Sequence, residues 1–387
     1  MLSFNHVAAG LRLFCGPNSL GQIPLELDRL QRRRVAVICG KTVARSPMLG
    51  RVREHLGERC ATVFDGVRPH SPVDSVEEAA RALVESRADA VLAIGGGSAI
   101  VTARAASIRA AEGKAVRSLC SYRDNEGRFL SPKLLAPKLP QFVVPTTPTT
   151  AIVKAGSGVL DEHLGRRMTL FDPKTRAQAV FVDPDLALSA PSKLVTTASL
   201  NCLAMAVEGL ESDSGNPLSD GMLLHVLRML KTNLPETQRG TMDGDSRCQL
   251  ILASILCGQG TDHASPGIAA ALGHSMGIRL GIDNGLANGI LLPFTMRFNA
   301  PVTKDRLYKV ANVLGETVSN DAVDAAIRGV GDLLRVLGVP QRLRDANIDR
   351  QALPDVAAIA MEDWFTFRNP RPVLDKQVAL EILESAW

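Results

Sequence analysis

The pattern of apolar and polar positions changes character about halfway along the chain. In the first half, short apolar, β-branched runs alternate with stretches of helical periodicity. Residues 35–39, 61–64, 90–94 and 142–144 have the composition of buried strands, and residues 75–85 and 101–111 that of helices. Such alternation predicts a parallel sheet covered by helices. We also expect a hairpin in which residues 168–171 and 179–182 flank the turn-like DPKTR.

The second half has a different pattern. After DPDLALSAP (183–191), strand-like runs largely disappear and long amphipathic helices dominate, with Pro191 and Ser192 suited to a helix start. The 387 residues also exceed what one ordinary hydrophobic core organises. The sequence therefore predicts an α/β domain over residues 1–189 and an all-α domain over residues 190–387.

Composition narrows the class of protein. Hydrophobic content of 45% and charged content of 22% are typical of globular proteins. The net charge of +4 and a single short basic run, residues 32–34, argue against a nucleic-acid partner. No apolar run reaches the roughly 18 residues that span a bilayer, and the chain does not start with a signal-peptide pattern. Seven dispersed cysteines without a CxxC pair are typical of reduced thiols, so we expect a cytoplasmic protein. Because neither a nucleic acid nor a membrane is indicated as a partner, we expect a small-molecule substrate.

A glycine-rich turn is the first candidate for chemistry. The run 90–94 leads directly into Gly95-Gly96-Gly97-Ser98, and a helix is expected to begin near Ala99. Glycines at a strand-to-helix turn allow backbone N–H groups to approach a pyrophosphate, and the helix N-terminus attracts anions. By itself this signal is weak, because many such turns need glycine only for their geometry.

Longer motifs give the turn a context. GGGSAIVTARA (95–105), VVPTTPTTA (143–151) and FDGVRPHSPVDSVEEAA (64–80) resemble the GGGSxxDxAK, PTTxGTGSE and FDGVxPNPTxExV motifs of the iron-containing (group III) alcohol dehydrogenases. SLNCLAMAVEGLES (199–212), ALGHSMG (271–277), NGLANGILLPFTMRFN (284–299) and NPRP (369–372) resemble motifs of the same family, so the similarity covers nearly the whole chain. It implies an NAD(P)-dependent oxidoreductase that forms a homodimer. It also implies a dehydroquinate synthase-like architecture, with an N-terminal Rossmann-like parallel-sheet domain and a C-terminal all-α helical domain.

The resemblance also implies a set of cofactor-binding residues. They come from the two glycine- and threonine-rich loops: Gly95, Gly96, Gly97, Ser98, Thr146, Thr147 and Thr150. Two departures stand out: Val101 replaces the Asp of the first motif, and the second loop lacks the GTGS glycines. After the first strand, where many NAD enzymes have an acid, this chain has Gly40 followed by Lys41. That pair tolerates a 2′-phosphate and favours NADPH over NADH, although an ordinary turn has the same composition.

The metal-binding motif departs furthest from the family. The positions that hold Asp, His, His and His around Fe²⁺ or Zn²⁺ correspond to Asn201, Met205, Ala270 and Asn284. A neutral amide is a poor substitute for a carboxylate, alanine offers no ligand, and a thioether prefers Cu(I). Because a catalytic zinc site typically has about three protein ligands, we expect a metal-ligand-depleted member that binds no metal.

One histidine of the motif remains. His274 matches the second His of the HxxxH pattern, which in the family lies near the nicotinamide without binding the metal. It is a candidate for proton transfer near neutral pH, or alternatively a hydrogen-bonded buried histidine. Asn201 and Asn284 are candidates to bind a substrate carbonyl or hydroxyl, or alternatively to serve in polar packing.

These observations lead to a functional hypothesis. Maleylacetate reductases share the family fold without requiring a metal and resemble this chain at Asn201, but they usually keep the histidines that it lacks. We expect a metal-independent NAD(P)H-dependent reductase of an activated carbonyl or enone-like metabolite. A non-redox enzyme, such as an isomerase or lyase, and a catalytically silent ligand-binding protein are the alternatives.

Overall fold

The computed structural model describes residues 3–124, 126, 128–240, 242–316 and 321–387. Within these residues the chain forms two compact units. The α/β unit comprises Ala9–Ala190 and Asp243–Ile251, and the helical unit comprises the described parts of Met1–Ala8, Pro191–Met242 and Leu252–Trp387. The predicted fold class, a parallel-sheet domain plus an all-α domain, is confirmed. Two short segments, one at the start of the chain and one at 243–251, belong to a different unit from their neighbours in sequence.

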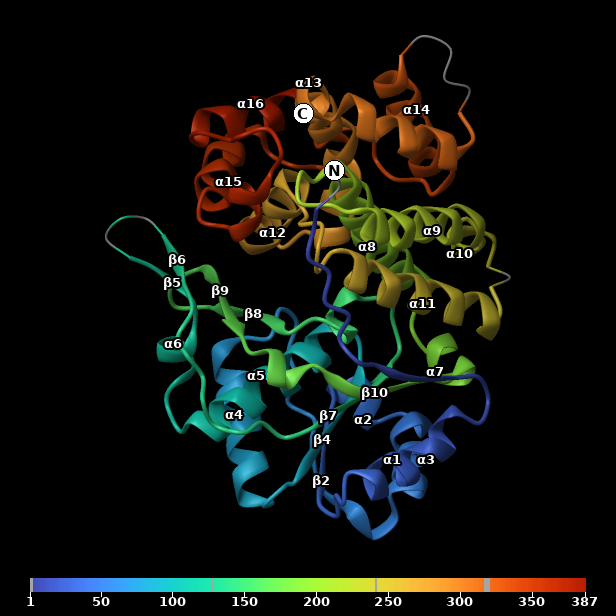
Figure 1. The fold of residues 1–387 in the computed structure, drawn as a ribbon, viewed down its shortest axis with the longest axis vertical. Helices are drawn as coiled ribbons and strands as arrows, with labels where there is room; N and C mark the ends of the chain where they lie inside the picture. Colours follow the sequence, from blue (N-terminus) through green and yellow to red (C-terminus); the bar gives the residue numbers. More distant parts are fainter. Residues whose placement is uncertain (1–2, 125, 127, 241, 317–320) are drawn as a thin grey trace. The chain divides into compact units, whose positions relative to one another are not determined.

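A six-stranded parallel sheet forms the centre of the α/β unit (Figure 1). Its strand order is β1-β10-β7-β4-β2-β3. The strands are β1 (Arg12–Cys15), β2 (Val35–Ile38), β3 (Cys60–Phe64), β4 (Ala90–Gly95), β7 (Gln141–Pro145) and β10 (Ala177–Val182). The chain places β3 on one side of β2 and β4 on the other, so the direction of winding reverses between β2 and β4. In open α/β sheets, ligands bind outside the carboxyl ends of the strands at such a reversal.

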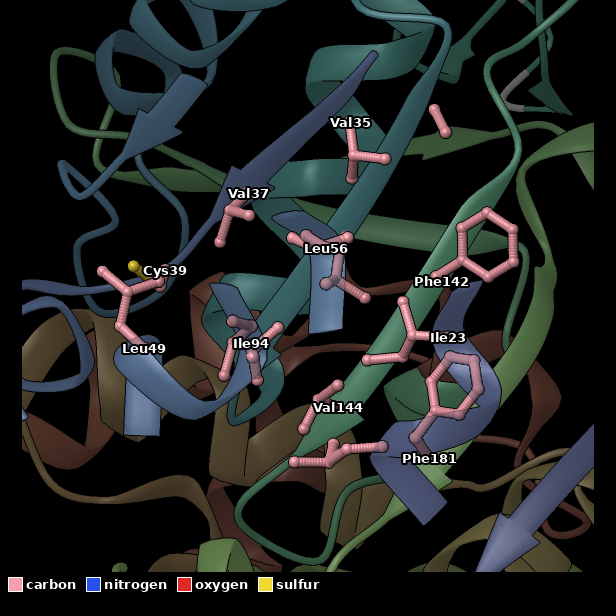
Figure 2. Close-up of a cluster of buried hydrophobic side chains, with 14 of the residues drawn as sticks. Ile23, Val35, Val37, Cys39, Leu49, Leu56, Ile94, Phe142, Val144 and Phe181 are labelled. Carbon is pink, nitrogen blue, oxygen red and sulfur yellow. The ribbon is translucent and has the colours of Figure 1, made fainter. Parts of the chain in front are cut away.

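Helices cover both faces of this sheet, which explains why its central strands are apolar at nearly every position, with Gln141 and Gln178 as exceptions. The helices of this unit are α1 (Ile23–Arg29), α2 (Lys41–Ala44), α3 (Pro47–Leu56), α4 (Val73–Glu85), α5 (Gly97–Glu112), α6 (Val116–Leu119) and α7 (Pro184–Leu188). Figure 2 shows one of the two cores, where Ile94, Phe142 and Phe181 of neighbouring strands lie with Ile23 of α1 and Leu56 of α3. Alternate strand residues point to the opposite face, which α4 and α5 cover.

The expected hairpin around DPKTR is wrong. Strand β9 (Arg166–Phe171) pairs antiparallel with β8 (Gly156–Asp161), whereas β10 lies in the main sheet between β1 and β7. The burial patterns explain the difference. β10 is almost wholly buried, as a strand covered on both faces must be, whereas β8 and β9 alternate between buried and more exposed residues. The glycines in GSGVLD weakened the strand signal of β8. A further short pair, β5 (Tyr122–Arg123) and β6 (Phe129–Leu130), is also antiparallel.

The helical unit is built from long and short helices that pack closely. They are α8 (Ser192–Glu211), α9 (Pro217–Asn233), α10 (Glu236–Arg239), α12 (Ile268–Leu280), α13 (Asn284–Leu314), α14 (Ala322–Val336), α15 (Leu353–Ala360) and α16 (Lys376–Ala386). Helix α11 (Gly244–Gly260) is shared, because its first turns belong to the α/β unit. No helix within the described residues is both long enough and apolar enough to cross a membrane.

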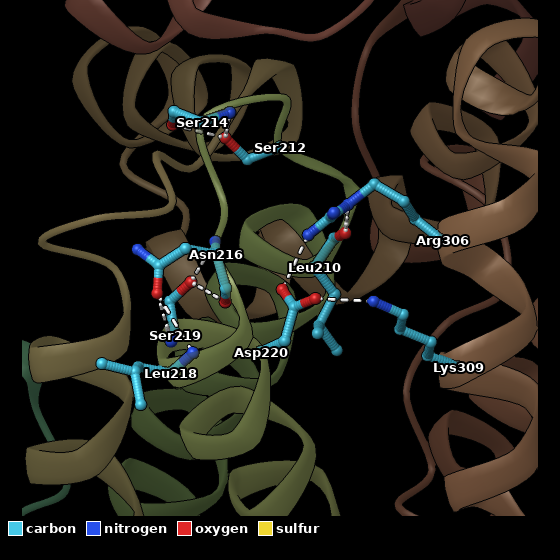
Figure 3. A network of polar contacts seen from close by, with 9 residues as sticks. All are labelled: Leu210, Ser212, Ser214, Asn216, Leu218, Ser219, Asp220, Arg306 and Lys309. Atoms are coloured by element: carbon cyan, nitrogen blue, oxygen red, sulfur yellow. Dashed lines mark hydrogen bonds and ion pairs between the residues drawn. The ribbon is translucent and has the colours of Figure 1, made fainter. Parts of the chain in front are cut away.

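Ionic contacts join three of these helices (Figure 3). Asp220 of α9 accepts hydrogen bonds from Arg306 Nη2 at 2.7 Å and Lys309 Nζ at 2.6 Å, both on α13. The Nε of Arg306 also donates to the Leu210 carbonyl of α8. Asp220 is buried, and its two cationic partners compensate for the loss of hydration that burial imposes. This network holds α8, α9 and α13 together.

Candidate functional site

In the α/β unit, the predicted cofactor-binding segments lie at the carboxyl ends of adjacent strands. Gly40 follows β2, the glycine turn follows β4, and the threonine-rich loop follows β7. Register pairs Ile38 with Ala93 and Gly95 with Pro145, so the three segments share one edge of the sheet. This edge includes the reversal between β2 and β4. The residues that the sequence singled out are thus brought to the position where the topology favours ligand binding.

The glycine turn fits closely against the threonine-rich loop. Gly95 has φ +136°, a conformation that residues with a side chain rarely adopt. A Cβ at Gly96 would lie 2.7 Å from Thr147 Oγ1, and one at Gly97 would lie 3.2 Å from Thr149 Oγ1. The Thr146 N–H also donates to the Gly95 carbonyl at 3.0 Å. The glycines are therefore required for the two loops to approach each other.

The N-terminus of α5 is suited to a phosphate. Its N-cap is Gly96, no side chain caps it, and its first turn carries no acidic residue. The N–H groups of such a helix end and its partial positive charge favour an anion. The residues present thus fit the pyrophosphate of a dinucleotide, with residues 95–98 as the groups that would hold it.

A buried arginine fixes the second loop, a feature that the sequence analysis missed. Arg104 of α5 is fully buried and donates to the Ala151 carbonyl at 2.5 Å and the Gly156 carbonyl at 2.7 Å. Ala151 is the last residue of the threonine-rich motif, and Gly156 is the first residue of β8. The sequence signal that could have identified Arg104 was its place in the GGGSAIVTARA motif. Arg104 therefore ties this loop to the helix that begins at the glycine turn.

The residues proposed for cofactor choice lie at the end of β2. Gly40 is the N-cap of α2, and Lys41 is exposed. Gly40 forms an isolated bridge with Gly66, so the loop after β3 lies beside it. Position 40 carries no acidic group that would repel a phosphate on the adenosine ribose.

In the helical unit, the four positions that the family resemblance assigns to metal ligands lie on three helices that pack together. Asn201 and Met205 are on α8, Ala270 is on α12, and Asn284 is the first residue of α13. Close packing is possible because of glycine: a Cβ at Gly285 would stand 1.7 Å from a backbone oxygen of α8. Helix contacts therefore bring the corresponding segments of the family motif together.

Asn201 is held by protein contacts. Its side-chain amide meets that of Asn288 on α13 at 2.8 Å and lies 3.6 Å from Met205 Sδ. The Asn288 amide faces the carbonyls of Ala269 at 2.9 Å and Asn284 at 3.2 Å, so its nitrogen is the atom that donates to them. Its oxygen then faces Asn201, and a hydrogen bond forms there only if the Asn201 amide is turned as well, so that its nitrogen rather than Oδ1 points to Asn288 and its oxygen rather than Nδ2 points to Met205 Sδ. Asn288 links α8, α12 and α13, and the sequence analysis had not singled it out.

Asn284 is oriented differently. Its Oδ1 is buried without a hydrogen-bond partner and occupies the space that a side chain at Gly277 would need, 2.2 Å from the Cβ position. A buried amide oxygen without a donor costs roughly 1–3 kcal/mol. The substrate-binding role of Asn284 stays a prediction, and any ligand at this oxygen must supply a donor.

The chemistry of these side chains does not fit a divalent metal. Where the resemblance implies a carboxylate and three imidazoles, this chain has two amides, a thioether and a methyl group. Within the described ranges, no group of three or more His, Cys, Asp or Glu side chains is arranged to hold a metal ion. No catalytic step is therefore assigned to a metal at these positions.

His274 is paired with a carboxylate that the sequence did not reveal. Its Nδ1 lies 2.8 Å from Asp363 Oδ2, and the two residues are 89 positions apart in the chain. Both side chains are mostly buried, with 14% and 15% of their surface exposed. The ring of Phe365 lies 5.8 Å from the His274 ring, centroid to centroid, at a tilt of 36°. This is the arrangement of an imidazole that a carboxylate orients for acid–base chemistry.

The N-terminus of α12, the helix that carries His274, is satisfied by side chains from elsewhere in the unit. Asn369 Oδ1 accepts from the Ile268 N–H at 3.1 Å, and Glu208 Oε1 accepts from the Ala269 N–H at 2.6 Å. Glu208 also accepts from the Ala270 N–H. Burial raises the pKa of Glu208 to about 7, against the opposing effect of these N–H groups. Glu208 is thus part of the frame that positions α12.

Comparison with known proteins identifies the family to which this chain belongs. Residues 11–184 match the family model described as iron-containing alcohol dehydrogenase, and residues 195–387 match the C-terminal model of the Fe-containing alcohol dehydrogenase family. The chain therefore belongs to the iron-containing alcohol dehydrogenase family, whose members are oxidoreductases, and the predicted family is confirmed.

Individual relatives show how far the similarity extends. The chain is 28% identical over 383 residues to lactaldehyde reductase of Escherichia coli (strain K12), covering 96% of this chain and 97% of that protein. It is 27% identical over 372 residues to maleylacetate reductase 1 of Cupriavidus pinatubonensis (strain JMP 134 / LMG 1197), covering 96% and 93%. The structure of sulfoacetaldehyde reductase from Bifidobacterium kashiwanohense in complex with NAD+ superposes with a TM-score of 0.85 at 21% identity, covering 100% and 99%. The fold is thus shared along the whole chain.

Proposed function

We propose that this protein is a metal-independent, NAD(P)H-dependent reductase of an activated carbonyl or enone-like metabolite. The observation that carries the proposal is the contrast within one helix, α12. Ala270 replaces a family metal ligand, whereas His274, one turn further, is held by Asp363. Helix α12 thus keeps a side chain for acid–base chemistry, although it lacks a ligand for the metal ion that acts as the Lewis acid in the family.

Each unit contributes a different function. The α/β unit binds the nucleotide through residues 95–98 and the loop that contains Thr146, Thr147 and Thr150. A bound NAD(P)H supplies the hydride. In the helical unit, His274 supplies the proton that the substrate oxygen takes up as it is reduced. Amide donors near the former metal positions, Asn201 among them, stabilise negative charge that develops on that oxygen; one such donor is worth about 3–4 kcal/mol.

Cofactor choice follows from position 40. Gly40 leaves room for a 2′-phosphate, and the exposed Lys41 beside it supplies a positive charge. We therefore expect NADPH to bind more tightly than NADH. Reversal of that order in a thermal-shift titration would contradict this part of the proposal.

The metal-free claim has a direct test. Purified protein is dialysed against EDTA, its metal content is measured, and NADPH oxidation is followed at the nicotinamide absorbance band with a panel of activated aldehydes, ketones and enones. We expect the rate to be unchanged by EDTA. The matched control restores the family ligands together, as Asn201→Asp, Met205→His, Ala270→His and Asn284→His, and should acquire Zn²⁺ that EDTA removes. Loss of wild-type activity on chelation would contradict metal independence.

The thermal-shift titration and the absorbance assay together separate the non-redox alternatives, which the Val101 and GTGS departures favour. If neither NADH nor NADPH shifts the melting temperature, the protein is not a reductase. Product formation without a change in nicotinamide absorbance would then identify an isomerase or lyase.

A further inference from the structure

Asp363 has two separate contacts, one from each carboxylate oxygen. Oδ1 accepts from the Phe365 N–H at 2.9 Å and caps the short 3-10 helix Trp364–Arg368. Oδ2 lies 2.8 Å from His274 Nδ1 on α12. The carboxylate is therefore fixed by its own backbone at one oxygen and presents the other to the imidazole.

The contact determines where the imidazole carries its proton. An ionised carboxylate can only accept hydrogen bonds, so Nδ1 must be the donor. In the neutral ring Nε2 then carries no proton, and it is the nitrogen that gains one when the imidazolium forms. A carboxylate at this distance also stabilises that imidazolium.

We propose that Asp363 is a positioning residue for the reaction: it fixes His274 in the Nδ1–H tautomer, so that Nε2 is the atom that exchanges a proton with the substrate. The inference rests on the proposed function. In the reducing direction, the imidazolium Nε2–H bond breaks, the proton moves to the substrate oxygen, and the ring is left neutral with its Nδ1–H directed to Asp363. Solvent then returns a proton to Nε2.

Other charged groups near this pair lie on neighbouring elements. Glu208 of α8 is close enough to Asp363 for their charges to interact, and burial raises the pKa of Glu208 to about 7. On α12 itself, Arg279 pairs with Asp355 of α15 at 3.0 Å, and both side chains are about half exposed. That second pair is a useful comparison, because it also involves an aspartate and α12 but does not contact His274.

The two contacts of Asp363 predict an unusual consequence of Asp363→Asn. The amide oxygen must still accept from the Phe365 N–H, so the amide nitrogen then faces His274 Nδ1. Because that nitrogen is a donor, Nδ1 must become the acceptor and the proton moves to Nε2. The near-isosteric substitution should therefore invert the tautomer of His274 with little effect on the fold.

Nitrogen NMR of protein labelled with ¹⁵N-histidine measures the tautomer without any substrate. The resonances of His274 are those lost in His274→Gln. We expect the Nδ1–H tautomer in the wild type and in Asp355→Asn, and the Nε2–H tautomer in Asp363→Asn. An unchanged tautomer in folded Asp363→Asn would overturn the proposal, whether or not the protein proves to be a reductase.

Kinetics then test the consequence for turnover. We expect Asp363→Asn to lower kcat about tenfold or more, since general acid–base catalysis contributes roughly 10²–10⁴-fold, with KM and NADPH affinity little changed. Asp363→Glu should recover part of the rate, and Asp355→Asn should match the wild type. Wild-type kcat in an Asp363→Asn protein with inverted tautomer would overturn the role of Nε2. Absence of NADPH turnover in the wild type would instead refute the proposed function and leave the NMR result standing.

Discussion

Side chains at the positions that the family resemblance assigns to metal ligands take part in packing. Asn201 lies in an amide network with Asn288, and Ala270 is buried at the start of α12, where its N–H is bound by Glu208. These contacts join α8, α12 and α13 through protein groups alone. His274 differs because its side chain, itself able to carry a proton, is paired with the carboxylate of Asp363.

A single substitution tests the role of His274. His274→Ala removes the proposed proton donor and is expected to lower kcat/KM for NADPH-dependent reduction at least tenfold. The matched control is His225→Ala, because His225 is exposed on α9 in the same unit. An equal rate in wild type and His274→Ala would remove this residue from the mechanism.

At the scale of elements, glycine residues determine how closely α8, α12 and α13 approach one another. The sequence NGLANG contains the first glycine of α13, Gly285, which contacts the backbone of α8 at Thr197. A second glycine contact occurs on α12, where a Cβ at Gly273 would overlap Asn288. Helices can approach this closely only where one of them lacks a side chain.

Gly285→Ala should therefore be strongly destabilising. The added Cβ would stand 1.7 Å from the Thr197 carbonyl oxygen, and a backbone atom cannot turn aside as a flexible side chain can. We expect a loss of about 2 kcal/mol or more in the free energy of unfolding, measured by urea denaturation. Gly221→Ala on α9 is the control, since nothing lies within 4 Å of its Cβ position and alanine favours helix. Similar stability in the two variants would show that the α8–α13 contact is not tight.

Periodicity predicted the elements far better than their pairing. The strands at 35–39 and 90–94 and the helices at 75–85 and 101–111 were readable because apolar positions repeat at the period of each element. The partner of β9 was not readable, because GSGVLD combines glycines with short apolar runs. The His274–Asp363 contact was also hidden, since it joins residues 89 apart whose proximity depends on helix packing.

At the scale of the molecule, two buried carboxyl groups make stability depend on pH. Glu211 of α8 is buried and accepts from Asn299 Nδ2 at 3.2 Å and Thr303 Oγ1 at 3.3 Å. Burial raises its pKa from 4.5 to about 8, and the nearby Glu208 contributes to the rise. The pKa of Glu208 itself is raised from 4.5 to about 7. In the native state both groups therefore hold their protons at pH values where the unfolded chain has lost them.

The direction in which stability changes with pH depends on how many protons the native and unfolded states bind. Between about pH 4.5 and pH 8 the native state binds more protons than the unfolded state, so the free energy of unfolding falls as pH rises. The slope is at most about 1.4 kcal/mol per pH unit for each group. The contribution of Glu208 and Glu211 to the free energy of unfolding is fully present below pH 4.5 and is lost as pH rises through 7 and 8.

Glu211→Gln isolates this contribution. Glutamine has the shape of the protonated carboxyl: its oxygen can accept from Asn299 Nδ2, and its amide nitrogen then faces Thr303 Oγ1, which can accept. Glutamine cannot titrate, so we expect the stability of this variant to fall less steeply from pH 5.5 to pH 8.5 than that of the wild type. The chain's two tryptophans, Trp364 and Trp387, both lie in the helical unit, so their fluorescence during urea denaturation reports the unit that contains Glu211. Glu381→Gln, at an exposed position of α16, should reproduce the wild-type slope. If Glu211→Gln gives that same slope, Glu211 is ionised in the native state, and its charge must be stabilised by more than the Asn299 and Thr303 hydrogen bonds.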